Sequence, residues 1–146
     1  MWRLVSWQVT DGAGRRTKPY GDHPVGQIIY TANGEMSAQL MAEVNPAASL
    51  DDGAKDKTVA QTVADQFIAY FGRYDYDETN ATLSHHVEGS LLLNWVGTTV
   101  TRQVRHLDHQ RLDLGAHIAP ETVSHAQNLA GNHHLVWHRV LDTAKP

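Results

Sequence analysis

The 146-residue chain contains no cysteine. This absence excludes a disulfide scaffold, a cysteine-ligated zinc site, an iron–sulfur cluster and a thiol nucleophile. The longest apolar run has five residues, at 67–71, whereas a membrane-spanning helix needs about 20. Arg3, Ser6 and Gln8 interrupt the opening segment, so the sequence predicts no signal peptide. These absences favour a cytoplasmic protein without a membrane partner.

Basic residues are also in deficit, with 12 against 16 acidic residues and a net charge of −4. A nucleic-acid binder usually carries a basic surface, so we expect no nucleic-acid partner. Neither a glycine-rich phosphate loop nor the Gly-x-Ser-x-Gly motif of hydrolases occurs. We therefore expect no cofactor. Histidine, in contrast, is abundant, with ten residues.

The dominant hydrophobic period is two, which is typical of strands. Turn signals separate short runs, and the pair Asn33-Gly34 is the strongest of the hairpin signals. The pattern predicts a single all-β domain over residues 1–146, an eight-stranded antiparallel barrel that is filled or holds one small ligand. The expected strands cover residues 2–9, 25–31, 35–42, 74–77, 81–88, 98–107, 111–118 and 133–141.

One segment breaks the period of two. Val59, Val63, Phe67 and Phe71 recur every four residues, and Gly72 follows them. This spacing predicts an α-helix over residues 58–72, inserted between the third and fourth strands. We expect this helix and the preceding loop, residues 45–57, to gate one end of the barrel.

Several segments of the chain resemble a known family. The opening sequence WRLVSW, at residues 2–7, resembles the first strand of calycin barrels. Further blocks at 19–21, 24–30, 34–41, 85–90 and 94–98 are similar to the bacterial and fungal lipocalin-like domain family. The resemblance implies a small calycin-like barrel with an internal pocket, but no single activity. The chain departs from typical lipocalins because its expected helix lies before the fourth strand.

The calycin resemblance also implies a structural pair. In such barrels an arginine from the last strand lies across the tryptophan of the first strand. The corresponding residues here are Arg139 and Trp2. We therefore expect the guanidinium to stack on the indole, a cation–π contact worth about 0.5–2 kcal/mol.

Candidate catalytic residues are His86, Glu88 and Arg102, and we expect His86 and Glu88 to face the cavity. His86 and Glu88 stand two apart on an expected strand, so they share one face. A carboxylate beside an imidazole can prepare a general base, and Arg102 on the next strand could stabilise negative charge. The alternative is a solvent-exposed pair, which Leu83 and Val87 favour because they make the opposite face apolar.

Other side chains are candidates for binding a ligand, although each could be an ordinary strand residue: Tyr30, Gln39, Tyr74, Trp95 and His106. A metal site is not expected. His134 and His138 share a strand face but lie about 13 Å apart, too far for one ion.

These observations support two classes of function. The first is a binding module that encloses a small amphipathic or hydrophobic organic molecule. The second is a cofactor-independent cyclase, isomerase or dehydratase that acts on a biosynthetic intermediate by His/Glu acid–base catalysis. The sequence does not identify the ligand or the reaction, and it leaves a homodimer open.

Overall fold

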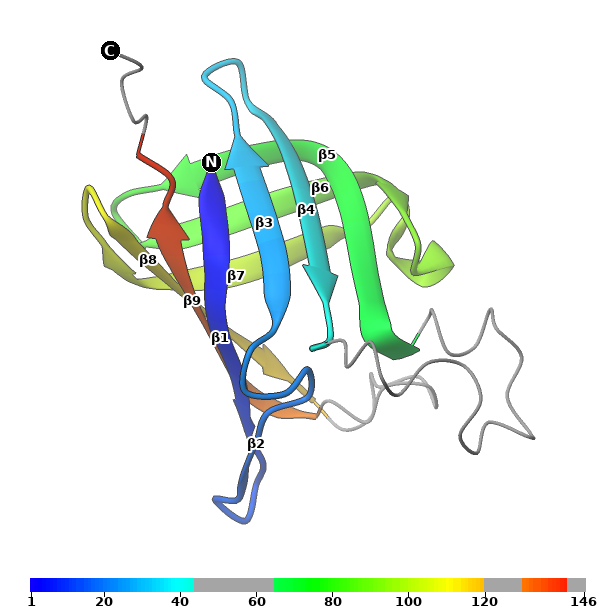
Figure 1. Cartoon of the computed structure of the whole chain (residues 1–146). Helices are drawn as coiled ribbons and strands as arrows, with labels where there is room; N and C mark the ends of the chain where they lie inside the picture. Colours follow the sequence, from blue (N-terminus) through cyan, green and yellow to red (C-terminus); the bar gives the residue numbers. More distant parts are fainter. Residues whose placement is uncertain (44–64, 120–129, 142–146) are drawn as a thin grey trace.

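The computed structural model describes residues 1–43, 65–119 and 130–141. Every strand pair is antiparallel, and the strands follow one another around the sheet in chain order apart from β2, which lies beside β1 (Figure 1). The strands are β1 (Trp2–Thr10), β2 (Arg16–Thr17), β3 (Val25–Tyr30), β4 (Glu35–Met41), β5 (Phe67–Asp77), β6 (Thr82–Ser90), β7 (Thr99–Leu107), β8 (Arg111–Ile118) and β9 (Gly131–Arg139).

Pairing of β1 with β9 closes the sheet into a barrel. Eight strands form the wall, and the two-residue β2 pairs only with the end of β1. The predicted eight-stranded antiparallel barrel is therefore confirmed. Within the described ranges, no helix is long and apolar enough to cross a membrane.

The predicted helix over residues 58–72 is wrong from Phe67 onward, while residues 65–66 are helical. From Phe67 onward the chain is the 11-residue strand β5, while residues 44–64, which include the expected gating loop, lie outside the described residues. A spacing of four is also a multiple of two, so it fits one face of a strand equally well. Gly72 does not end a helix: it lies within β5, where an added Cβ would overlap the carbonyl oxygen of His86.

A bulge in β1 determines which of its side chains reach the core. Trp2 and Leu4 are buried, but so are Trp7 and Val9, which have the opposite parity. The register with β9 shifts between Leu4 and Ser6, so that Val5 has no partner in the ladder. The extra residue resets the alternation and keeps all four apolar side chains on the inner face.

The expected contact at the barrel closure is present. Trp2 and Arg139 are partners in the β1–β9 register, and the guanidinium carbon lies 4.2 Å from the centroid of the indole. Trp2 itself is 5% exposed. The first and last barrel strands are thus joined by side chains as well as by the backbone ladder.

Candidate functional site

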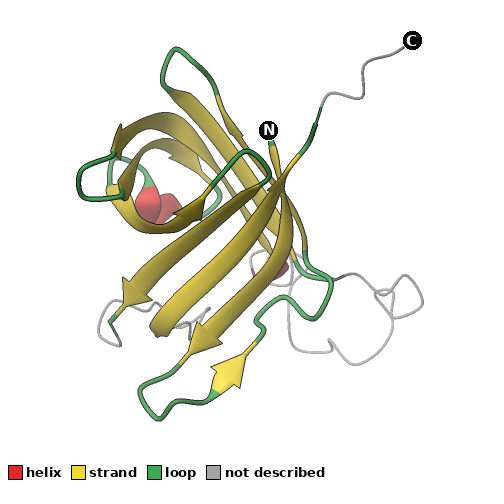
Figure 2. Cartoon of the chain, turned by 90° about the vertical axis from the view of Figure 1, so that its left-hand side faces the viewer, coloured by secondary structure: helices red, strands yellow, loops and turns green. Residues whose placement is uncertain are grey.

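The barrel encloses a cavity of about 640 Å³. Its wall is largely apolar, with Trp7, Ile28, Leu40, Ile68, Leu114 and Trp137 among the side chains that line it. A short 3-10 turn, η2 (Leu93–Trp95), lies within the curl of the strands and adds Trp95 to the lining (Figure 2). The volume and the mixed lining fit a small hydrophobic ligand.

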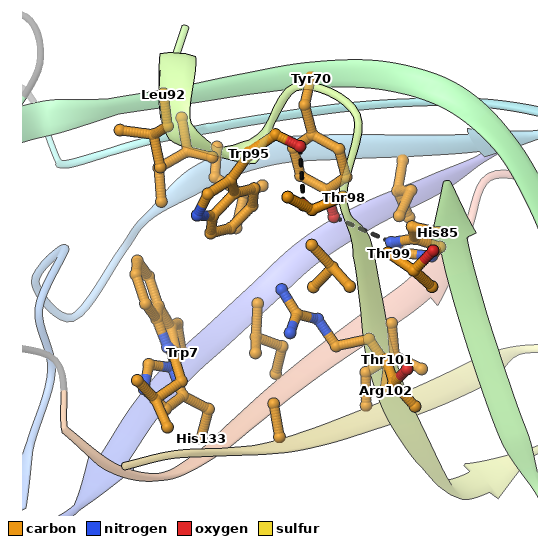
Figure 3. Close-up of a pocket in the computed structure, with 18 of the residues that line it drawn as sticks. Trp7, Tyr70, His85, Leu92, Trp95, Thr98, Thr99, Thr101, Arg102 and His133 are labelled. Atoms are coloured by element: carbon orange, nitrogen blue, oxygen red, sulfur yellow. Dashed lines mark hydrogen bonds between the residues drawn. The ribbon is translucent and has the colours of Figure 1, made fainter. Parts of the chain in front are cut away.

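His85 on β6 is the central polar group of the cavity wall. It has no exposed surface, and both of its ring nitrogens are hydrogen-bonded. The hydroxyl of Tyr30 lies 2.9 Å from Nε2. The hydroxyl of Tyr70 lies 3.0 Å from Nδ1 (Figure 3). Burial and the positive charge of Arg102 lower the pKa of His85 to about 3. The imidazole is therefore neutral at physiological pH.

Arg102 extends from β7 into the cavity, toward the space bounded by Trp7, Tyr70 and Trp95 (Figure 3). Its charge acts on the neighbouring phenols. Burial raises the pKa of Tyr70, and the positive charge of Arg102 opposes that shift. A guanidinium next to two hydrogen-bonded phenols and a neutral imidazole can bind an acceptor oxygen or stabilise a negative one.

A second polar contact lies elsewhere on the cavity wall. The indole Nε1 of Trp7 donates a hydrogen bond to Nδ1 of buried His133, with 3.1 Å between the nitrogens. The ring of Tyr20 packs edge-on against Trp7, at 4.7 Å between centroids. These contacts fix the orientation of the indole, which is one of the large apolar faces offered to a ligand.

The expectation that His86 and Glu88 face the cavity is wrong. Glu88 is exposed, and His86 lies on the outer wall, where its nitrogens lie 2.7 Å from a carboxylate oxygen of Asp75 and 2.9 Å from the hydroxyl of Thr99. Both residues have the parity opposite to that of the buried side chains of β6. Of the three residues predicted to be catalytic, only Arg102 lines the cavity.

The sequence prediction missed His85 by one position. Leu83, His85 and Val87 are the buried residues of β6, at 5%, 0% and 3% exposure. The apolar pair Leu83 and Val87 carried the necessary signal, because a residue midway between two buried strand residues must share their face. The choice between adjacent histidines depended on that parity.

Three of the predicted ligand-binding residues lie in or near this site. Trp95 lines the cavity and packs edge-on against Tyr70, with 5.4 Å between ring centroids. Tyr30 stands behind His85 and supports it. Tyr74 packs against Tyr30 and donates a hydrogen bond from its hydroxyl to the carbonyl oxygen of Thr31, which stabilises the turn after β3.

The other two are placed away from the cavity. Gln39 is on the outer face of β4, where its amide bonds with Gln27 and Ser37. His106 is exposed near the β7–β8 turn, with Nε2 2.8 Å from a carboxylate oxygen of Asp108. In the ranges that the structure describes, no three His, Asp or Glu side chains are grouped to hold a metal ion.

Comparison with known proteins agrees with this architecture. A family model described as a lipocalin-like domain matches residues 1–140. No curated protein matches the chain. The family match spans nearly the whole chain, and the closed antiparallel barrel with its internal cavity is what the earlier resemblance implied. The chain therefore belongs to the family of lipocalin-like domains.

Proposed function

We propose that this protein binds a small amphipathic organic molecule inside the barrel. The observation that carries the proposal is the cavity itself, in which three tryptophans and several aliphatic side chains surround the polar cluster of His85, Tyr70 and Arg102. The apolar wall supplies most of the binding free energy, at roughly 25 cal/mol per Å² of apolar surface removed from water. The cluster around His85 and Arg102 orients the polar end of the molecule.

A neutral fluorescent probe tests this proposal. We expect N-phenylnaphthylamine to bind the wild-type protein with increased probe emission and with quenching of the tryptophans, since Trp7, Trp95 and Trp137 line the cavity. Ala116 on β8 also lines it. Ala116→Phe places a ring in the cavity, so we expect the affinity for the probe to fall at least about tenfold, or 1.4 kcal/mol.

The matched control is Ala69→Phe. Ala69 lies on β5 between buried Ile68 and Tyr70, so its side chain faces outward. This variant adds the same ring without filling the cavity, and its probe affinity should equal that of the wild type. Circular dichroism and thermal melting check that both variants are folded. Equal affinities for the two variants would place the probe outside the barrel and contradict the proposal.

Catalysis in the same cavity is the second candidate function, and the chain of groups from Tyr30 through His85 to Tyr70 favours it. This chain ends at the cavity wall, where the Tyr70 hydroxyl can donate to an oxygen that becomes negative during a cyclisation or isomerisation. His85, with its pKa near 3, is too weak a base at neutral pH to remove a proton from carbon. It would act by positioning Tyr70.

Proton exchange tests this second function. If the site stabilises an enolate, with solvent hydroxide accepting the proton from carbon, small cyclic ketones in D₂O should exchange the protons next to the carbonyl faster with wild-type protein than in buffer. Tyr70→Phe should lower the rate by about 10²–10⁴, the usual share of one proton-donating group. Nuclear magnetic resonance measures the exchange, and Ala116→Phe serves as the blocked-cavity control. A wild-type rate equal to that of the blocked variant would remove support for catalysis of this type.

A further inference from the structure

The cavity has a charge opposite in sign to that of the chain. The protein as a whole carries a net charge of −4. The described residues that line the cavity include the cation of Arg102 but no aspartate or glutamate. A positive potential inside a mostly apolar wall favours an anion, because the low-polarity surroundings screen the attraction weakly.

Arg102 differs from Arg111, an exposed arginine at the start of β8, in what balances its charge. Arg111 donates two hydrogen bonds, both of 2.7 Å, to the carboxylate of Asp113. No carboxylate of the described residues lies within ion-pair distance of Arg102. The groups on which its charge acts are neutral: Tyr30, Tyr70 and His85. Holding a guanidinium against an apolar wall without a counter-charge costs free energy, which an anionic ligand would offset.

The hydrogen-bond chain supplies a donor beside this cation. Neutral His85 has one protonated nitrogen, so it accepts on one side and donates on the other. Among the described residues, the hydroxyl of Tyr30 is hydrogen-bonded to His85 alone. The tautomer in which Tyr30 donates to Nε2 leaves no phenol proton of Tyr30 unpaired, and in this tautomer Nδ1–H donates to the oxygen of Tyr70. The Tyr70 proton is then left to donate into the cavity that this residue lines.

We propose that Arg102 and the Tyr70 hydroxyl together bind the carboxylate of an apolar monocarboxylic acid. A single uncompensated guanidinium matches a single negative charge, and the adjacent phenol adds one hydrogen bond to the same group. The apolar body of the acid then lies against the tryptophans and aliphatic side chains of the wall. This inference rests on the proposed function, because it identifies the class of molecule that the cavity takes.

Displacement of N-phenylnaphthylamine by decanoate and by decanol tests the proposal, since the two competitors share a chain length and differ in charge. With the wild-type protein near neutral pH, decanoate should displace the probe at a concentration at least about tenfold lower than decanol does. In Arg102→Gln the two competitors should become equal within about twofold. Arg102→Lys should retain part of the preference, because it restores the charge without the planar donor geometry.

The matched control is Arg105→Gln. Arg105 lies on the same strand but is exposed and does not line the cavity, so the variant removes the same charge from the outer surface. Its preference for decanoate should equal that of the wild type. Probe binding without a wild-type preference, or an equal loss in both glutamine variants, would overturn the carboxylate site and leave the proposed function standing. Failure of the neutral probe to bind at all would overturn both.

Discussion

Acidification from pH 6.5 to pH 3 is expected to destabilise this protein through His85. The pKa of this buried imidazole is lowered from 6.5 to about 3 in the folded state. Between these values the unfolded chain binds a proton that the folded chain excludes. The contribution of neutral His85 to the free energy of unfolding is therefore complete above pH 6.5. It is lost as the pH falls, by about 1.4 kcal/mol per pH unit and about 4 kcal/mol between pH 6.5 and pH 3.

Urea denaturation at a series of pH values measures this effect. The control is His85→Asn, whose side chain keeps a donor and an acceptor for the two tyrosines but does not titrate in this range. Replacement of the ring lowers stability at every pH. The comparison is therefore between the slopes of the free energy of unfolding against pH, not between its values at one pH. We expect the wild type to lose stability more steeply than the variant below pH 6.5. Parallel curves for the two proteins would show that His85 is protonated as readily in the folded state as in the unfolded chain.

Trp2→Ala is expected to lower the free energy of unfolding by about 3–5 kcal/mol, the range typical of a large buried aromatic side chain. Trp2 is 5% exposed and belongs to the contact surface between β1 and β9. Its removal leaves a cavity at the closure of the barrel and strips the Arg139 guanidinium of the ring beneath it. The loss thus combines missing apolar burial with the missing cation–π contact.

Arg139→Gln separates these two contributions. It keeps the indole buried and removes only the cation, so its cost should be about 0.5–2 kcal/mol. Trp2→Phe, which retains a ring of smaller area, should lie between the two. Urea denaturation at neutral pH measures all three variants. A cost for Trp2→Ala below that of Arg139→Gln would mean that the indole contributes nothing to closure beyond its contact with the cation.

The barrel was predictable because its signals are local. Hairpin turns such as Asn33-Gly34 end one strand and begin the next, and apolar residues alternate without interruption along strands such as β4. The pairing of Trp2 with Arg139 spans nearly the whole chain and was reached through the family resemblance. The inserted helix failed at Phe67 because a spacing of four residues does not distinguish a helix from a strand.

The polar cluster was harder to predict for a different reason. His85, Tyr30 and Tyr70 come from three strands, β6, β3 and β5, and meet only after the barrel has closed. Sequence spacing reports neighbours on one strand, which is how His86 and Glu88 were paired. Arg102 was reached only as a possible counter-charge on the strand next to that pair, so its position in the cavity was not predicted for the right reason.

The bulge at Val5 has a consequence for how the gene can change. Deletion of this single residue would place Leu4 and Trp7 two positions apart, so strict alternation without a bulge would keep Trp2, Leu4, Trp7 and Val9 on the inner face. Substitutions on the outward face of β1 do not change which of its side chains face the core. The first strand can therefore lose one residue at the bulge without moving a core side chain, whereas loss of Gln8 would make Trp7 and Val9 adjacent and turn one of them toward solvent.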